Sequence, residues 1–112
     1  MNLNEFIAEA RFPFSQWIME GEVKAYLRAS RRNIGEQKTF VLDVATVDVE
    51  KQHQRQGHFK RFLAEVERVC PFPFIYVECV QYDWLGAFLE RNGWTRDARY
   101  ESDLNYYKQL SK

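Results

Sequence analysis

The sequence predicts an α/β (α+β) fold, a mixed β-sheet with helices packed on it, in one domain over residues 1–112. Two runs, residues 40–49 and 74–80, are apolar on both faces, as central strands are. Between them, residues 59–69 place their apolar side chains on one helical stripe. A strand, a helix and a strand in this order form a βαβ unit. The two strands should therefore be parallel and joined by a right-handed crossover.

The segments before this unit predict two helices and a strand. Apolar residues recur at helical spacing over 3–10, where Asn2 and Glu5 could cap the helix. A short second helix is expected over 14–18 from the spacing of its apolar residues. Residues 23–30 alternate strictly between apolar and polar, which indicates a half-exposed strand.

The segments after the unit predict one helix and two closing strands. The helix is expected over 82–92, because the dipeptide at 92–93 is Asn-Gly and glycine tolerates the left-handed cap. Residues 94–99 and 104–110 read as strands. The predicted order of elements is α-α-β-β-α-β-α-β-β.

Composition and charge exclude several classes of protein. The chain is 46% hydrophobic and 16% aromatic, enough for one core, and its 16 basic and 16 acidic side chains balance. That balance argues against a protein that coats nucleic acid or an anionic membrane. No apolar run is long enough to cross a membrane, and the N-terminus does not read as a signal peptide. Cys70 and Cys79 form neither a disulfide framework nor a zinc site, so we expect reduced thiols, no metal and a cytoplasmic location.

The junction before the central helix is the place where chemistry is expected. Residues 50–56 are all polar, and Gly57 ends the run. A helix N-terminus offers unpaired N–H donors, and glycine lets a ligand approach the backbone, so this junction suits a pyrophosphate. Arg55, Lys60 and Arg61 add positive charge. A polar loop that enters any helix would look similar, so these properties alone leave a purely structural role open.

Residues 49–59 resemble the cofactor motif of the GNAT superfamily of N-acetyltransferases. That motif is a strand ending in valine, followed by Gln/Arg-x-x-Gly-x-Gly/Ala at the start of a helix. Gln54 takes the first place and Gly57 the second. Phe59 stands where glycine or alanine is usual. Its ring could crowd the phosphates, or it could turn into the core and leave the N–H group accessible.

A second resemblance follows at residues 85–94. They are similar to the later helix of the same family, which ends in a Tyr-Glu-Lys-x-Gly-Phe pattern. Glu90, Arg91 and Gly93 fit this pattern conservatively. Leu89 occupies the place of the tyrosine that often acts as general acid.

The resemblance implies an acetyl-CoA-dependent N-acetyltransferase, a small member of the family. It implies a mostly antiparallel sheet with a central parallel strand pair that splays apart, and helices on both faces. Acetyl-CoA would lie between the splayed strands, where a primary amine would attack the thioester directly. Backbone groups near Val47 and Val49 would bond the acetyl carbonyl and the pantetheine arm. The other cofactor-binding residues that it implies are Gln54, Arg55, Gln56, Gly57, His58, Phe59 and Lys60, with the N–H groups of residues 55–59 on the pyrophosphate.

Asp43 and Tyr82 are the candidate catalytic residues. Asp43 is a carboxylate inside an apolar strand, where burial should raise its pKa toward neutrality, so it is the candidate base. It also matches the position of the catalytic glutamate in the histone-acetyltransferase branch of the family. Alternatively, Asp43 pairs with an arginine or is hydrogen-bonded to a loop. Tyr82 is the best-placed general acid for the departing thiolate.

Other polar groups are weaker candidates, for which packing or solvation is the simpler interpretation. Glu78 could face the cleft or solvent. The arginines at 28, 31 and 32 could bind an acidic substrate, although the solvated end of a hairpin is the simpler interpretation. The remaining members of this group are His53, Tyr106 and Tyr107.

Two functions remain open at this point. The first is an active N-acetyltransferase, and the second is a catalytically silent module of the same fold that binds acyl-CoA, a protein partner or both. Phe59, Leu89 and the short region before the hairpin keep the second alternative open. A short region also leaves an open groove, which favours a protein lysine or N-terminus as acceptor over a small molecule. The aromatic C-terminal strands could in addition pair two copies into a homodimer.

Overall fold

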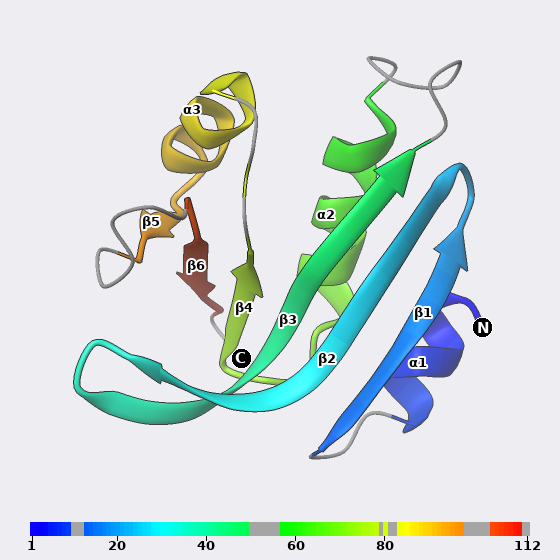
Figure 1. The fold of residues 1–112 in the computed structure, drawn as a ribbon, viewed down its shortest axis with the longest axis horizontal. Coiled ribbons are helices and arrows are strands. Elements are labelled where there is room, and N and C mark those ends of the chain that lie inside the picture. The colour runs from blue at the N-terminus through cyan, green and yellow to red at the C-terminus, as the bar shows by residue number, and fades with distance from the viewer. Residues whose placement is uncertain (10–12, 50–56, 79, 81–82, 98–103, 111–112) are drawn as a thin grey trace.

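The structure is a computed structural model. It describes residues 1–9, 13–49, 57–78, 80, 83–97 and 104–110, and every statement below concerns this part of the chain. The nine elements are α1 (Leu3–Glu9), β1 (Phe14–Glu20), β2 (Val23–Ile34), β3 (Gln37–Val49), α2 (His58–Val69), β4 (Phe74–Val77), α3 (Asp83–Arg91), β5 (Thr95–Arg96) and β6 (Tyr106–Gln109), all shown in Figure 1.

The six strands form one sheet in the order β1-β2-β3-β4-β6-β5. Every neighbouring pair is antiparallel except β3 and β4, which are parallel from Val41↔Phe74 to Val44↔Val77. The predicted mixed, mostly antiparallel sheet with a central parallel pair is therefore confirmed. Because β6 lies between β4 and β5, Tyr106 and Tyr107 are paired on both edges. A homodimer that paired β6 at these residues would have to displace a neighbour, whereas β5 lies at the edge of the sheet.

Helix α1 begins where the sequence predicts. The Glu5 N–H donates to Asn2 Oδ1 at 2.8 Å, and the Asn2 N–H donates to Glu5 Oε1 at 3.0 Å. This reciprocal pair is a capping box, which satisfies two backbone donors at the start of the helix. Leu3 and Phe6 then bury their side chains in the core.

The short second helix expected over 14–18 is wrong, because this segment is strand β1. Its apolar residues have helical spacing, but only Ile18 is buried, while Trp17 and Met19 are exposed. All seven residues pair with β2 through a tight turn in which Gly21 has a φ of 58°. Pairing along a long neighbouring strand has outweighed a local pattern that is too short to nucleate a helix on its own.

The described helices lie on one face of the sheet, and not on both faces as expected. The buried side chains of α1, α2 and α3 form a single cluster with Leu42, Val44, Ile75 and Val77. In Figure 1, α1 and α2 lie behind β1–β3. Chain topology explains the arrangement: β3-α2-β4 and β4-α3-β5 cross the sheet in the same direction, and right-handed crossovers in one direction place both helices on one face.

The opposite face, called here the open face, carries the second and smaller cluster. Its buried members are Ile34, Val41, Phe74 and Tyr76, with Tyr107 packed against them. No described helix covers this face. A ligand could therefore reach the sheet directly from this side.

Gly86 sets the distance between α3 and the sheet. A Cβ at this position would lie 2.9 Å from the Tyr106 hydroxyl oxygen, and Tyr106 is itself buried. We expect Gly86→Ala to lower the free energy of unfolding by about 1–3 kcal/mol, as overpacking does, despite the better helix propensity of alanine. Urea denaturation measures the effect.

Tyr106→Phe is the matched partner for this test, because it removes only the oxygen that the new methyl group would meet. The double variant should recover most of the stability lost in Gly86→Ala. A Gly86→Ala protein that is more stable than wild type would contradict the close packing of α3 on β6.

Candidate active site

The parallel strands β3 and β4 separate after Val44. Among the described residues, the last hydrogen bond between them runs from the Glu78 N–H to the Val44 carbonyl at 3.1 Å. Beyond it β3 continues to Val49 against β2 alone, whereas the Val80 N–H donates to the carbonyl of Leu104 at 2.7 Å. No described strand pairs with the other edge of β3 over residues 45–49, the stretch that carries Val47 and Val49.

A β-bulge lies at the same point. Tyr26 and Leu27 are consecutive in β2, but they pair with Thr46 and Val44 of β3, so Ala45 is an extra residue. A bulge bends its strand and increases its twist. The bulge therefore helps β3 to turn away from β4 where the pairing ends.

The start of α2 has the geometry of an anion cradle. Gly57 is left-handed, with a φ of 79°, and no side chain caps the helix. The first helical bond runs from the Arg61 N–H to the Gly57 carbonyl at 3.0 Å, so the N–H groups of residues 58–60 precede the helical ladder. A Cβ on Gly57 would come within 2.9 Å of an Arg61 guanidinium nitrogen. The first turn has no acidic residue, which suits a phosphate.

The side chains of this first turn contact the core, Arg61 and helix α3. Phe59 is partly buried and packs against the main core, so its ring has turned inward, the second of the two alternatives raised by the sequence. His58 Nδ1 lies 3.0 Å from Arg61, and Lys60 Nζ lies 4.7 Å from the ring centroid of Phe88 in α3. The other predicted residues of the loop, Gln54, Arg55 and Gln56, lie outside the described residues, as do His53 and Tyr82.

Asp43 lies on the open face, directly before the point of separation. The residue is fully buried, and its Oδ2 accepts a hydrogen bond from Arg32 at 2.9 Å. The Oδ1 atom receives no hydrogen bond from any described residue. Pairing with an arginine, one of the alternatives raised by the sequence, is therefore present, and the Glu78 carboxyl group lies against the same aspartate.

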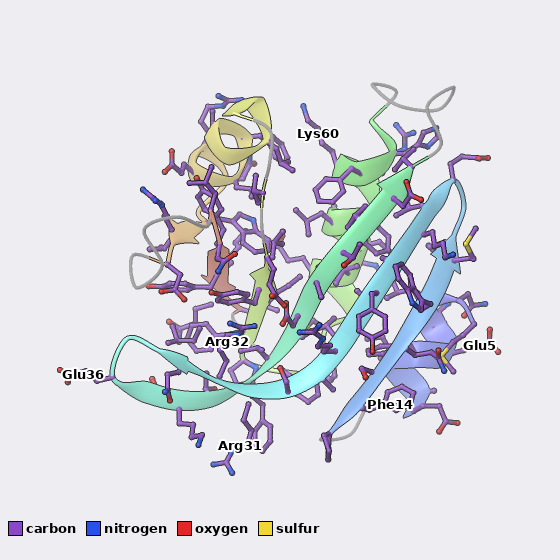
Figure 2. The ribbon with its side chains drawn as sticks, viewed as in Figure 1. Glu5, Phe14, Arg31, Arg32, Glu36 and Lys60 are labelled. Atoms are coloured by element: carbon purple, nitrogen blue, oxygen red, sulfur yellow. The ribbon has the colours of Figure 1, made fainter. Side chains whose placement is uncertain are left out.

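Arg32 holds this cluster together. Besides Asp43, its guanidinium lies 3.3 Å from Glu78 and 4.0 Å above the ring centroid of Tyr76. Arg28 adds a second contact to Glu78 at 3.4 Å. Figure 2 shows that Arg31 and Arg32, although adjacent in β2, extend to opposite sides of the ribbon. Arg31 therefore agrees with the sequence interpretation of a solvated arginine at the hairpin, whereas Arg32 is paired with carboxyl groups.

Burial, and after it contact with the Glu78 carboxylate, raise the pKa of Asp43 to about 8, because two adjacent carboxylates cannot both ionise easily. The contact with Arg32 opposes this shift and is already included in it. A carboxyl group that titrates near neutral pH can exchange a proton with a reactant.

Tyr76, which the sequence did not single out, supports Arg32 from below. Its hydroxyl donates to Asp97 Oδ2 at 2.6 Å. Burial and this bond raise the pKa of Tyr76, so the hydroxyl stays protonated at neutral pH. Leu89 is fully buried and has no polar group, while Tyr106 is buried and Tyr107 partly so, which fits the packing interpretation of both tyrosines.

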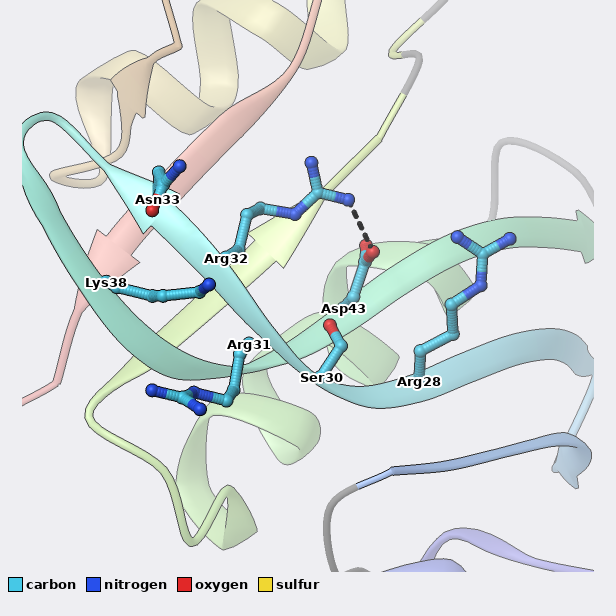
Figure 3. A pocket seen from close by; sticks show the side chains of 7 residues that line it. All are labelled: Arg28, Ser30, Arg31, Arg32, Asn33, Lys38 and Asp43. Carbon is cyan, nitrogen blue, oxygen red and sulfur yellow. Dashed lines mark hydrogen bonds and ion pairs between the residues drawn. The ribbon is translucent and has the colours of Figure 1, made fainter.

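A pocket of about 430 Å³ opens beside Asp43 on the hairpin formed by β2 and β3 (Figure 3). Its lining residues are Arg28, Ser30, Arg31, Arg32, Asn33, Lys38 and Asp43. Within the described part of the chain, no group of His, Cys, Asp and Glu residues could hold a metal ion, and no helix is long and apolar enough to span a membrane.

Solved structures with the same arrangement of elements identify the fold. One is an acetyltransferase assigned to the GNAT family from Desulfovibrio desulfuricans, at a TM-score of 0.57 and 18% identity, over 83% of this chain and 66% of that one. The chain has the GNAT fold. A chain of the KacTA–DNA complex matches at a TM-score of 0.60 and 17% identity, over 96% of this chain and 78% of that one. No family model and no curated protein sequence matches.

The raised pKa of Asp43 predicts how stability depends on pH. Between about pH 3.8 and pH 8 the folded protein holds a proton on Asp43 that the unfolded chain has lost. The contribution of this group to the free energy of unfolding is therefore full at acid pH and is lost as the pH rises to about 8. Asp43→Asn removes this dependence, so its free energy of unfolding should rise relative to wild type across that range.

Urea denaturation at a series of pH values measures this difference. Asp48→Asn is the matched control, since it makes the same substitution at an exposed site on the same strand. A constant difference between the Asp43→Asn variant and wild type across that range would refute the raised pKa.

Proposed function

We propose that this protein is an N-acetyltransferase that transfers an acetyl group from acetyl-CoA to a primary amine by direct attack. The separation of β3 and β4 after Val44 carries the proposal. It leaves one edge of β3 without a described strand partner between the N-terminus of α2 and the carboxyl group of Asp43. Acetyl-CoA is expected in the cytoplasm, which suits a cytoplasmic location for this protein.

The residues at the start of α2 fit the diphosphate of acetyl-CoA. The N–H groups of residues 58–60 point out of the helix start, and the macrodipole favours negative charge there. Gly57 has no side chain to obstruct the approach, and Lys60 and Arg61 are close. Backbone N–H and C=O groups of β3 at Val47 and Val49 would hydrogen-bond to the pantetheine arm, in the way that a strand edge binds an extended peptide. When bound, acetyl-CoA supplies an activated acetyl group as a thioester.

Asp43 would take the proton that the amine must lose. An amine attacks only when neutral, and a base with a pKa near the working pH is the most effective. The Oδ1 atom of Asp43 has no donor among the described residues, so it can accept a proton directly or through a water molecule. Arg32 fixes the other oxygen and thereby orients the carboxyl group. A backbone N–H of β3 would stabilise the oxyanion.

The second candidate function is a catalytically silent module that binds acyl-CoA or a protein partner. Leu89 favours it, because this fully buried side chain offers no hydroxyl where the family often has one. The likeness to a chain from a complex that contains DNA also shows that the fold occurs in larger assemblies. The open face favours a bulky acceptor or partner, such as a protein lysine or N-terminus.

Acetyl-CoA should raise the melting temperature if it binds the folded state. S-Acetylpantetheine, which lacks the diphosphate, should raise the melting temperature far less. Gly57→Val should abolish the shift caused by acetyl-CoA, because valine is strained at a φ of 79° and fills the cradle. Differential scanning fluorimetry measures both shifts. Equal shifts with the two ligands would rule out diphosphate binding at α2.

Turnover separates the two candidate functions. With acetyl-CoA and a mixture of amines, the wild-type protein should release free CoA thiol. Asp43→Asn should lower this rate roughly 100-fold or more, as the loss of a general base does, and keep the thermal shift. Asp48→Asn is the control and should behave like wild type. A wild-type protein that shows the thermal shift and no thiol release would be the silent module, whereas normal turnover in Asp43→Asn would remove Asp43 from catalysis.

A further inference from the structure

Two carboxyl groups meet at one nitrogen atom of Arg32. The Nη2 atom of this guanidinium lies 2.9 Å from Asp43 Oδ2 and 3.3 Å from Glu78 Oε2. The carboxyl groups of Asp43 and Glu78 also lie against each other. Two ionised carboxylates in contact repel each other and can only accept hydrogen bonds, so a proton between them removes the repulsion. Asp43 and Glu78 therefore form a pair that can hold one proton between its two members.

The two members of this pair differ in their access to solvent. The side chain of Asp43 is 1% exposed, whereas that of Glu78 is 20% exposed. Glu78 is also the residue at which β3 and β4 separate, because its N–H makes the last hydrogen bond to Val44 among the described residues. A reactant that enters from the open face, at the point where the strands separate, therefore meets Glu78 before Asp43.

The groups that surround the pair hold it in place and favour a neutral amine. Arg28 and Arg32 face it from β2, and Tyr76 of β4 lies against the guanidinium of Arg32. Figure 3 shows the two arginines on either side of Asp43. Their positive charges repel an ammonium ion but not a neutral amine, and the neutral amine is the form that attacks a thioester.

We propose that Glu78 is a second catalytic residue of this site, and that the proton of the amine reaches Asp43 through Glu78. This inference rests on the proposed acetyltransferase function, to which it adds the point where the proton enters. The amine nitrogen bonds to the acetyl carbon, and the C–S bond breaks with its electron pair left on sulfur. The proton lost by the nitrogen passes to Glu78 and comes to lie between Glu78 and Asp43. The pair thus gains one proton and loses one negative charge, which leaves with the CoA thiolate.

The protonation state of the pair agrees with this step. A pair that already holds its proton is a poor acceptor for another. At about pH 8, the pKa of Asp43, half of the molecules have lost this proton and can take one from an amine. After the reaction, the exposed side of Glu78 gives the proton a route to solvent. If Glu78 were only structural, it would pair with Arg28 and Arg32 and contribute nothing to the rate.

Single and double variants test this relay in the release of CoA thiol from acetyl-CoA with a mixture of amines. Glu78→Gln should lower the rate roughly tenfold or more, because an amide cannot carry the proton. The double variant with Asp43→Asn should lose no more than Asp43→Asn alone, since residues that act as one unit are not additive. Glu36→Gln is the control and should keep the wild-type rate, because Glu36 is exposed at the turn between β2 and β3 (Figure 2). A wild-type rate in Glu78→Gln, or losses that multiply in the double variant, would overturn the inference.

An added carboxylate separates a proton-carrying role of Glu78 from a structural one. Glu78→Ala leaves space on the exposed side of the pair, where formate can take the place of the missing carboxyl group. Formate should therefore raise the rate of Glu78→Ala in proportion to its concentration, and should not raise that of Asp43→Ala, whose position is buried. Formamide has the same size and no charge, so it should restore nothing. If formate and formamide changed the rate of Glu78→Ala equally, the role of Glu78 would be structural and the inference would be overturned.

The wild-type protein separates this outcome from that of the proposed function. Glu78→Gln and Glu78→Ala should keep the thermal shift caused by acetyl-CoA, which shows that they are folded and bind the cosubstrate. Thiol release by the wild type that does not depend on Glu78 would contradict the relay alone. A wild-type protein that releases no thiol would contradict the acetyltransferase and the relay together.

Discussion

The short pairing between β3 and β4 is the constraint on which the rest of the site depends. The two strands pair over four residues each and then separate. Strand β3 stays paired with β2, whereas the chain after β4 bonds to the segment before β6. A parallel sheet that continued would have used the backbone groups of β3 for its own ladder. Because the β3–β4 pairing stops at Val44, the edge of β3 beyond this residue has no described strand partner. Helix α2 starts a few residues after the end of this edge. The bulge at Ala45 changes the direction of β3 at that residue, so the local backbone geometry of β3 itself helps to end the pairing.

The charged cluster on the open face is costly for the fold, which is a reason to connect it with function. Arg32 is shared between two carboxyl groups, Asp43 and Glu78, and only Glu78 has a second cation, the more exposed Arg28. Removing charges from water costs more than one shared ion pair returns, and an apolar cluster at the same place would be at least as stable. Tyr76 and Asp97 support Arg32 through a ring contact and a buried hydrogen bond, and so keep its guanidinium in position. Perturbed carboxyl groups of this kind concentrate at functional sites.

The sequence predicted the elements whose signals are local. The βαβ unit, the capping box and the stop at Gly93 all followed from periodicity or from residues within one turn. The strand β1 did not, because seven residues with helical spacing can also pair as a strand when a long partner is adjacent. The single-sided arrangement of the helices depends on the strand order, which no local pattern contains. Burial of Asp43 was predictable, but its partner was not: Arg28 lies opposite Asp43 in the register, yet Arg32, four residues further along the strand, makes the hydrogen bond.

A GNAT fold alone does not distinguish an enzyme from a binding module, so the decision depends on this chain's own side chains. Two departures from the family pattern have different consequences. Phe59 packs against the main core, so its ring does not oppose a diphosphate at the first turn of α2. Leu89 removes one position for a general acid, which concerns the departing thiolate and not the amine. In the proposed mechanism the proton of the amine would pass to Asp43, which lies where the strands separate, on the face that no described helix covers. The proposed acid–base chemistry at the amine therefore rests on Asp43 and its neighbours, and not on the fold.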